Sequence, residues 1–440
     1  MFENKNILIM GLGITGRSAL ACLTHFPCKI YVYDEKMKDL KELEEDFILF
    51  KEEDLGRMAL IVKSPGIYPD HPLLQKARKK GIEIISDLEL AYRVTKCKNL
   101  IAITGTNGKT TTTTIVGKIL ASQNKTYVVG NIGKGILDIA LEAREEDYIV
   151  IEASSFQLED TVDFCPTIAL ITYVTKDHLD WHKTVEEYRQ AKYKIFANQG
   201  EENYLILNGE DPVLSRIEDI KSKIYYFGMK DQGHKGCFIE EDSIYFRDAA
   251  NQKIEVLPLN LIKIPGKHNV KNIMAAVNIA MILKIEPKKI RRVIENFYGV
   301  EHRIEFIGED HQVKYYNDSK ATNPDSTLVA VQAMDQPTVL IAGGYDKGSD
   351  FDELLRRCRN RISSLILFGE TAELLSREAK RYHYDIYIVE DLKKAVLVAN
   401  QVVCRPGNIL LSPACASWDM YSSYEERGQH FKDLVKELIS

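Results

Sequence analysis

Residues 100–111 read Leu-Ile-Ala-Ile-Thr-Gly-Thr-Asn-Gly-Lys-Thr-Thr, an apolar run that leads through a glycine-rich loop into helix-compatible sequence. This order is typical of a phosphate-binding α/β sheet, because the glycines leave backbone N–H groups free to wrap phosphate oxygens. Lys109 would neutralise the β- and γ-phosphates, and the Thr110 hydroxyl would bind Mg²⁺. The loop is shorter than the GxxxxGK(S/T) pattern, so we interpret it as a variant phosphate loop rather than as a glycine turn that happens to precede Lys-Thr. The residues expected to hold the nucleotide are Gly105, Thr106, Asn107, Gly108, Lys109, Thr110 and Thr111.

Strand-like β-branched runs alternate with helix-compatible sequence along the whole chain and fall into three groups. These runs are residues 6–10, 30–33, 59–63 and 82–85; 100–103, 148–151, 168–171 and 204–207; and 313–316, 338–342, 365–368 and 409–411. The alternation predicts mostly parallel α/β sheets, whose ligands lie at the carboxyl ends of the strands. Groups this far apart predict three domains, with joints near 94–98 and 297–302, and an antiparallel or irregular excursion at 228–258. The predicted domains are residues 1–95, 96–298 and 299–440.

A second glycine-rich loop, Gly11-Leu-Gly-Ile-Thr-Gly16, follows the first strand-like run and precedes a helix. Its GxGxxG spacing lets the backbone approach a diphosphate at a helix N-terminus, so we predict that it binds a nucleotide diphosphate. The conventional ligand is NAD, with Asp34 on a ribose hydroxyl, but the motif does not name the ligand and also fits a plain turn. Ser64-Pro65-Gly66 ends the third strand, where either such a ligand or an ordinary turn would lie.

Polar side chains that could bind a metal recur at the carboxyl ends of strands in the second group. Glu152 ends one strand-like run, where a carboxylate could bind Mg²⁺. Asp177, His178 and His182 follow the next run after a short loop. Each alone is more often a capping or surface residue, but their recurrence at one edge of the predicted sheet favours a metal-phosphate site.

Composition restricts the class of protein. The 440 residues carry 58 basic and 64 acidic side chains, a net charge of −6, so the basic excess typical of nucleic-acid or anionic-membrane binding is missing. No apolar run approaches the ~20 residues needed to span a bilayer, and residues 1–6 lead into a strand without a signal-peptide pattern. The eight cysteines form no CxxC pair, which is typical of reduced thiols. We expect a cytoplasmic monomer with no nucleic-acid partner and no membrane insertion.

Taken together, the motifs resemble those of the Mur ligase family over the full length of the chain. In order, they are GLGITG at 11–16, SPGI at 64–67, TGTNGKTT at 104–111, GNIG at 130–133, EASSFQL at 152–158, DHLDWH at 177–182, YRQAKYKIF at 188–196, GKHNVKNIMAA at 266–276, EHRIE at 301–305, NDSKATN at 317–323, GGYDKG at 343–348 and SPACASWDMY at 412–421. The phosphate loop is shared with related ligases. The Ser-Ser-Phe-Gln-Leu stretch after Glu152 and the stretch at 412–417 resemble the D-glutamate-adding member.

The resemblance implies both a fold and a reaction. An N-terminal Rossmann-like domain would bind a UDP-sugar, a central P-loop ATPase-type α/β domain would bind ATP, and a Rossmann-like C-terminal domain would bring the amino acid. The implied activity is ATP-dependent amide ligation in peptidoglycan precursor synthesis. The carboxylate of UDP-N-acetylmuramoyl-L-alanine would take the γ-phosphate, and the amine of D-glutamate would displace phosphate from the resulting acyl phosphate. The first glycine loop would then hold UDP, and NAD would be a false lead.

The resemblance also implies roles for individual residues. Lys192, which on the exposed helix expected around it would otherwise be a solvated cation, would react with CO₂ to form a carbamate and, with His178, bind the second of two Mg²⁺ ions. The implied catalytic residues are Lys109, Glu152, His178 and Lys192, and the implied metal ligands are Thr110, Glu152, His178 and Lys192. The UDP-sugar would contact Ile14, Thr15, Asp34, Ser64 and Asn131. ATP would also contact Asn269, Asn272, Arg303 and Asp318, and D-glutamate would contact Lys320, Thr322, Lys347, Ser417 and Tyr424.

Some residues depart from the family pattern, and some alternatives stay open. Tyr424 stands where the family often has Phe, and Trp418 stands where Leu is common. Cys415 is interpreted as a packing residue, because no base lies near it in sequence. Without the resemblance, Asn269 and Asn272 would be interpreted as a helix cap and a surface amide. The alternative functions are another amide ligase of the same architecture, a dinucleotide-dependent oxidoreductase that uses the first loop, and a P-loop switch protein without ligase activity.

Overall fold

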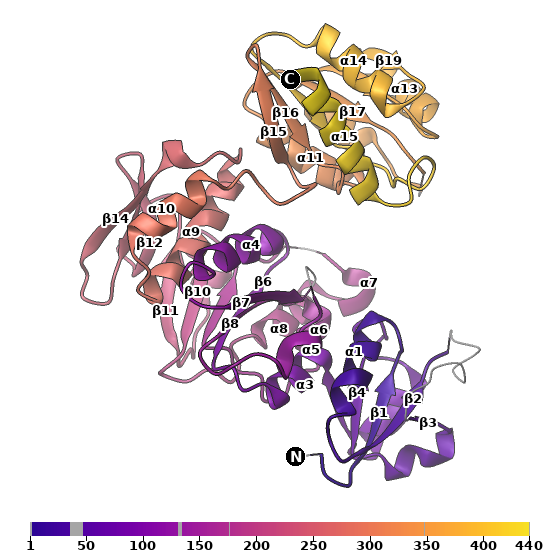
Figure 1. The fold of residues 1–440 in the computed structure, drawn as a ribbon, viewed down its shortest axis with the longest axis vertical. Coiled ribbons are helices and arrows are strands. Elements are labelled where there is room, and N and C mark those ends of the chain that lie inside the picture. The colour runs from indigo at the N-terminus through magenta and orange to yellow at the C-terminus, as the bar shows by residue number, and fades with distance from the viewer. Residues whose placement is uncertain (1, 36–46, 131–133, 176, 347, 440) are drawn as a thin grey trace. The chain divides into compact units, whose positions relative to one another are not determined.

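The computed structural model describes residues 2–35, 47–130, 134–175, 177–346 and 348–439. Over these residues the chain forms three sheets, one for each group of predicted strands (Figure 1), so the predicted three-sheet α/β fold is confirmed. By contacts the chain divides into two compact units, Met1–Leu259 with Lys271–Val293 and Asn260–Val270 with Ile294–Ser440. The first unit contains two of the sheets and the second unit contains the third.

The first sheet has five parallel strands in the order β3-β2-β1-β4-β5. Its elements are β1 Asn6–Met10, α1 Ile14–Leu23, β2 Lys29–Tyr33, β3 Ile48–Leu49, β4 Leu60–Lys63, α2 Pro72–Lys79, β5 Glu83–Ser86 and α3 Asp87–Val94. Ile7 and Ile9 of β1 pack in one hydrophobic core, and Leu8 and Met10 pack in another. Burial on both faces explains the continuous apolar run. The strand order reverses beside β1, so the loops after β1 and β4 flank a crevice of the kind that binds ligands.

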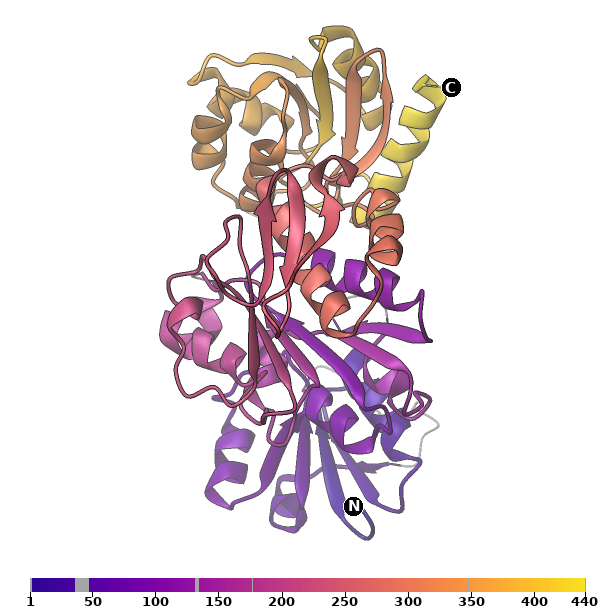
Figure 2. The ribbon, with the colours of Figure 1, turned by 90° about the vertical axis from the view of Figure 1, so that its left-hand side faces the viewer.

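The second sheet has nine strands in the order β14-β13-β12-β11-β10-β9-β6-β8-β7. Figure 2 shows strands of this sheet in purple to rose. Its strands are β6 Asn99–Thr104, β7 Thr126–Gly130, β8 Tyr148–Glu152, β9 Ile168–Ile171, β10 Tyr204–Asn208, β11 Lys223–Phe227, β12 Gly236–Glu240, β13 Ser243–Arg247 and β14 Lys253–Pro258. Strands β12 to β14 pair antiparallel, which confirms the excursion predicted at 228–258. The order reverses beside β6, so the loops after β6, β8 and β9 meet at one edge.

The helices that accompany this sheet differ in length. They are α4 Lys109–Leu120, α5 Leu137–Ala140, α6 Ser155–Glu159, α7 Leu179–His182, α8 Val185–Tyr193, α9 Lys267–Ile282 and α10 Pro287–Glu295. Helix α9 begins in the second compact unit and ends in the first.

The third sheet has six strands in the order β15-β16-β20-β17-β18-β19, all parallel except the β15–β16 pair. Its elements are β15 Glu305–Asp310, β16 Val313–Asn317, α11 Pro324–Ala333, β17 Thr338–Ala342, α12 Asp352–Cys358, β18 Ile362–Leu367, α13 Ala372–Lys380, β19 Asp385–Ile388, α14 Leu392–Val402, β20 Gly407–Leu411 and α15 Tyr424–Ile439. The loops after β16 and β20 therefore lie side by side at the carboxyl edge.

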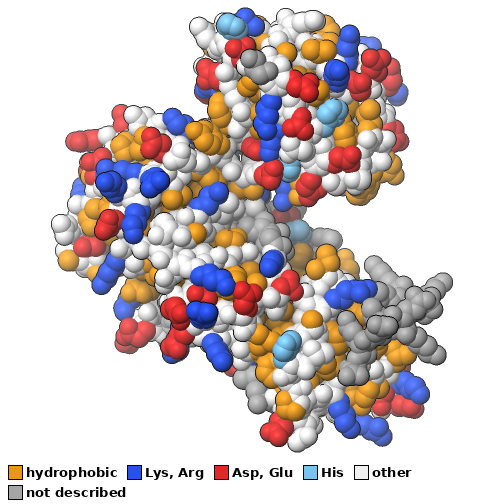
Figure 3. Space-filling view, in the orientation of Figure 1, with side chains coloured by type: hydrophobic (Ala, Val, Ile, Leu, Met, Phe, Trp, Pro, Cys, Tyr) orange, Lys and Arg blue, Asp and Glu red, His pale blue; other side chains and the backbone are white. Residues whose placement is uncertain are grey.

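Two further properties concern the charge of the surface and the apolar character of the helices. On the face drawn in Figure 3, acidic and basic side chains are interspersed. Within the part of the chain that the structure describes, none of the helices has both the length and the apolar character needed to cross a membrane.

Candidate active site

The phosphate loop occupies residues 105–108, between the end of β6 and the start of α4. Gly105 and Gly108 have φ angles of 143° and 84°, which side-chain-bearing residues rarely adopt. A Cβ atom on Gly105 would collide with the Thr172 hydroxyl, and one on Gly108 would collide with the side-chain oxygen of Asn272. Both glycines are therefore required by conformation and by space, and Asn272 lies directly against the loop.

Lys109, the first residue of α4, folds back over this loop. Its Nζ donates hydrogen bonds to the carbonyl oxygens of Gly105 and Thr106, each at 2.9 Å. The Thr106 hydroxyl accepts a hydrogen bond from the backbone N–H of Thr175 at 3.0 Å, which ties the loop to the segment after β9. A cation held over the loop backbone is in the position needed to neutralise phosphate charge.

Glu152 lies beside the loop because β8 pairs with β6, with Glu152 opposite Ile103. The Thr110 hydroxyl donates to Glu152 Oε1 at 3.2 Å, and Glu152 is buried (3% exposed). Among the described residues, Glu152 Oε2 has no hydrogen-bond partner. A buried carboxylate oxygen without a partner is costly, and carboxylate with hydroxyl oxygen is the donor set that Mg²⁺ prefers. The residues present therefore fit a magnesium ion.

Lys192 is buried (1% exposed), so it is not the solvated lysine that an exposed helix would ordinarily carry. Its Nζ donates to the Gly105 carbonyl oxygen at 3.0 Å and lies 4.4 Å from the Tyr188 ring centroid. Burial lowers the pKa of Lys192 well below its usual value, and the nearby charge of Lys109 lowers it further. Helix α8 exposes its opposite face to solvent and directs Lys192 inward, against the phosphate loop.

The two histidines of the 177–182 motif differ in their surroundings. The side chain of His178 is 47% exposed, and its ring lies 5.0 Å from Phe156 and 6.1 Å from Tyr188. Tyr188 therefore contacts both His178 and Lys192. His182 is buried, hydrogen-bonds Ser155 Oγ through Nε2 at 2.9 Å and stacks on Phe156.

In the first sheet, Asp34 and Ser64 both fix the backbone of the GxGxxG loop. Asp34 Oδ2 accepts a hydrogen bond from the Leu12 N–H at 2.6 Å, and the Ser64 hydroxyl donates to the Gly11 carbonyl oxygen at 2.9 Å. Ile14, the first residue of α1, is 84% exposed and Thr15 is half-buried beside it. The predicted contact Asn131 lies outside the described residues.

In the second unit, Asp318 is buried directly after β16. Its carboxylate accepts hydrogen bonds from the Ile304 N–H at 3.1 Å and from the Ser412 hydroxyl at 2.7 Å. Burial nevertheless raises the pKa of Asp318 to about 7, against the lowering effect of Ser412, Ile304 and the Arg303 charge. Asn269 is also buried, and its side chain donates to the Pro265 carbonyl oxygen at 2.7 Å.

The pKa of Asp318 predicts a pH-dependent stability. An unfolded aspartate titrates near about 3.9, so between about pH 4 and pH 7 the folded protein binds more protons than the unfolded chain. Stability due to this group therefore falls as the pH rises through that window. We expect the thermal midpoint of Asp318→Asn, relative to wild type, to be higher at about pH 8 than at about pH 5. A difference in thermal midpoint between Asp318→Asn and wild type that does not change with pH would contradict the raised pKa of Asp318.

The predicted amino-acid pocket is partly assembled in the same unit. Lys320 Nζ lies 5.6 Å from the ring centroid of Tyr424, and Ser417 is buried in the loop after β20. Thr322 follows Lys320 closely, with its N–H bonded to the Lys320 carbonyl oxygen. Lys347 lies outside the described residues. Burial raises the pKa of the Cys415 thiol to about 11, which agrees with a packing role.

Arg427 is a buried residue of this region that the sequence interpretation missed. Its guanidinium is 1% exposed and donates to the side-chain and carbonyl oxygens of Ser319 and to the carbonyl oxygens of Cys415 and Ala416, at 3.0–3.1 Å. It joins the loop that carries Lys320 to the loop that carries Ser417. Arg427 lies outside the recognised motifs, and an arginine on an amphipathic helix is ordinarily solvated, so the sequence pattern does not indicate this role.

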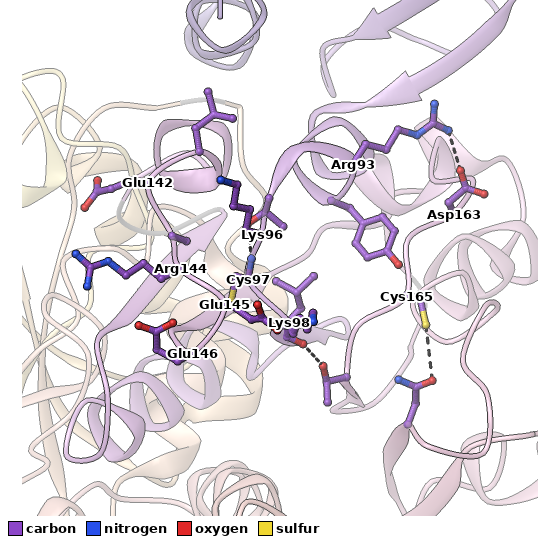
Figure 4. A pocket seen from close by; sticks show the side chains of 17 residues that line it. Arg93, Lys96, Cys97, Lys98, Glu142, Arg144, Glu145, Glu146, Asp163 and Cys165 are labelled. Carbon is purple, nitrogen blue, oxygen red and sulfur yellow. Dashed lines mark hydrogen bonds and ion pairs between the residues drawn. The ribbon is translucent and has the colours of Figure 1, made fainter. Parts of the chain in front are cut away.

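A cavity of about 1030 Å³ lies at the opposite, amino-terminal ends of β6 and β9. Figure 4 shows both basic and acidic side chains in its lining, among them Arg93, Lys96, Glu145 and Asp163. None of the predicted site residues that the structure describes lines it.

Comparison with known protein families decides which family combines these features. The chain matches the Mur ligase MurD-like N-terminal domain over residues 5–86, the Mur ligase middle domain over 103–280 and the Mur ligase glutamate ligase domain over 302–415. The chain belongs to the Mur ligase family. The prediction made from the motifs is thus confirmed at the level of the family.

Individual Mur ligases are similar to the whole chain. A UDP-N-acetylmuramoylalanine–D-glutamate ligase of Caldanaerobacter subterraneus subsp. tengcongensis is 43% identical, and one of Clostridioides difficile is 41% identical, with 99% of each chain covered. A crystal structure of the UDP-N-acetylmuramate-alanine ligase MurC from Thermotoga maritima has a TM-score of 0.57 at 19% identity and covers 99% of this chain and 100% of that one. At that identity, the structural likeness concerns the fold.

Proposed function

We propose that this chain joins D-glutamate to UDP-N-acetylmuramoyl-L-alanine with cleavage of ATP to ADP and phosphate, in peptidoglycan precursor synthesis. The D-glutamate ligases that resemble it at up to 43% identity over 99% of each chain support this substrate pair. The single observation that carries the chemistry is the buried oxygen of Glu152, beside Thr110 and the phosphate loop, that has no hydrogen-bond partner among the described residues. It supports a metal-nucleotide site at the switch point of the central sheet.

Each sheet then has a proposed task. We assign residues 1–95 to UDP-sugar binding, residues 96–298 to ATP binding and residues 299–440 to binding of the amino acid. The fixed GxGxxG backbone supports diphosphate binding near Ile14, Thr15, Asp34, Ser64 and Asn131. The proposed ATP contacts outside the phosphate loop are Asn269, Asn272, Arg303 and Asp318.

The proposed mechanism needs no side-chain nucleophile. The substrate carboxylate attacks the γ-phosphorus and ADP leaves, which converts a poor acyl donor into an acyl phosphate. The amine of D-glutamate then attacks the acyl carbon, and inorganic phosphate leaves. Lys109 and the loop N–H groups offset charge on the transferring phosphoryl group. Two bound Mg²⁺ ions would supply further charge neutralisation, held by Thr110 and Glu152 and by His178 with modified Lys192.

We propose that Lys192 carries a carbamate. Only a neutral amine attacks CO₂, and burial together with the Lys109 charge lowers the pKa of Lys192 well below its usual value, which favours the neutral form of the amine. The modification would place an anionic group with two oxygen ligands beside the charge of Lys109. A carbamate at this position would supply carboxylate-type ligation for a hard cation.

The proposed D-glutamate pocket combines Lys320, Thr322, Lys347, Ser417 and Tyr424. A cation with hydroxyl groups suits a dicarboxylate, and the approach of Lys320 to Tyr424 supports the grouping of these two residues. We further propose that the enzyme works as a cytoplasmic monomer.

A direct test of the substrate pair compares amino acids in a phosphate-release assay with ATP and UDP-N-acetylmuramoyl-L-alanine. We expect release with D-glutamate and a rate with L-glutamate at least about 100-fold lower, because a pocket built around charged groups leaves them unpaired when the substrate presents them wrongly. The panel includes L-alanine and a diamino acid. Release with one of these but not with D-glutamate would reject the proposed amino acid.

A further inference from the structure

Lys63, the last residue of β4, is a buried lysine that the proposed mechanism does not use. Its side chain is 0% exposed and forms an ion pair with Asp160 Oδ2 at 2.8 Å. The same Nζ donates to the Ile67 carbonyl oxygen at 3.2 Å and lies 5.4 Å from the centroid of the Trp181 ring. One buried cation thus has an anionic, a carbonyl and an aromatic partner.

These partners come from the segments that carry the proposed site. Ile67 belongs to the loop that begins at Ser64, which we assign to the UDP-sugar. Trp181 belongs to α7, three residues after the proposed metal ligand His178. Aromatic stacking adds a second contact between these two segments, because the ring of Tyr68 lies 4.4 Å from that of Trp181.

Asp160 connects Lys63 to the segment that follows Glu152. It directly follows α6, the helix that begins three residues after Glu152. The neighbouring Glu159 accepts a hydrogen bond from Trp181 Nε1 at 3.1 Å. Lys63 therefore contacts the segments that follow Glu152 and His178, two of the proposed metal ligands, and one segment of the proposed UDP-sugar site.

Other buried contacts hold the first two sheets together without Lys63. The Gln157 amide donates to both oxygens of Asp87, at 3.0 and 3.2 Å. Glu89 is fully buried and accepts hydrogen bonds from three successive N–H groups at 162–164. Removal of the Lys63 ammonium is thus expected to release the loop at 64–68 rather than to separate the sheets.

We propose that Lys63 is a positioning residue that sets the UDP-sugar loop against the metal-binding loop, an inference that rests on the proposed function. Stability alone does not account for a buried ion pair, since apolar residues of similar volume often stabilise a fold equally well or better. The Lys63 ammonium fixes the orientation of its neighbours, because it orients the Ile67 carbonyl and packs against the face of Trp181. The sugar-borne carboxylate is thereby held at the correct distance from the phosphate loop.

The test compares Lys63→Met with the double variant Lys63→Met/Asp160→Leu, which leaves no unpaired buried charge. Lys183→Met is the matched control, because Lys183 forms an ion pair with Asp70 between the same two segments, at 2.7 Å and with both side chains 65% exposed. Calorimetry measures Kd for UDP-N-acetylmuramoyl-L-alanine, and steady-state assays measure kcat and the KM values for ATP and D-glutamate. Thermal unfolding reports stability.

We expect both Lys63 variants to raise Kd for the UDP-substrate at least about tenfold and to lower kcat, with KM for ATP changed less than about twofold. The double variant should recover much of the thermal midpoint that the single variant loses, whereas Lys183→Met should behave as wild type. A double variant with wild-type Kd and kcat would overturn the proposal and leave Lys63 a structural residue. Absence of amide formation by the wild type would instead reject the proposed function, while the Kd comparison still decides the role of Lys63.

Discussion

Lys109→Met is expected to lower kcat for amide formation on the order of 10³-fold, the largest loss among the variants considered. The Lys109 ammonium lies 2.9 Å from two carbonyl oxygens of the phosphate loop, in position to meet the β- and γ-phosphates. Methionine keeps the length of the side chain and removes the charge. Charge on the transferring phosphoryl group then lacks its nearest compensating group in the protein.

The control for this variant is Lys118→Met, which lies in the last turn of the same helix and is exposed. It removes an equal charge from α4 without touching the loop, and we expect wild-type kcat. Circular dichroism and thermal unfolding should show that both variants are folded. Undiminished amide formation by Lys109→Met would refute the proposed nucleotide site.

Lys192→Ala is expected to reduce activity by on the order of 10²–10³-fold, with partial recovery when formate or acetate is added. The alanine leaves a buried cavity beneath the phosphate loop, next to the ring of Tyr188. A small carboxylate that enters it would supply the oxygen ligands that the carbamate provides in the wild type. Rescue of this kind is not expected for a lysine that serves only packing.

A readout independent of turnover accompanies this variant. Wild-type protein incubated with isotopically labelled bicarbonate should show a carbamate carbon resonance that Lys192→Ala lacks. Lys194→Ala, at the residue directly after α8, is the matched control, because Lys194 is exposed and bonds only the Thr161 carbonyl oxygen among the contacts described. Full activity of Lys192→Ala, or a labelled spectrum identical to that of wild type, would disprove the carbamate.

Much of the fold could be predicted from sequence because its parallel strands are buried on both faces. β1, β9 and β17 are continuous apolar runs, so their bounds in the structure agree with the prediction within a residue. Strands β3 and β19, two of those that were not predicted, have weaker patterns. β3 contains two exposed residues and β19 is an exposed edge strand, and neither buries enough side chain to produce a periodic signal.

The candidate site divides in the same way. Glu152 at the end of β8 and Thr110 just beyond the loop after β6 were predictable, because parallel topology alone brings these segments to one edge. Lys63 and Arg427 were not predicted, and Lys192 was named only through the resemblance. The burial of all three depends on which neighbours pack over them, and a lone lysine or arginine ordinarily reaches solvent. The GxGxxG loop shows a further limit: its spacing predicts a diphosphate but does not separate UDP from NAD.

The central claim is that ATP converts the carboxylate of the UDP-substrate into an acyl phosphate. The most direct measurement places a heavy-oxygen label in that carboxylate and follows it by mass spectrometry during turnover with ATP and D-glutamate. The account predicts that each phosphate released carries one labelled oxygen and that the amide product retains the other. Amide product formed together with phosphate that contains no label would contradict it.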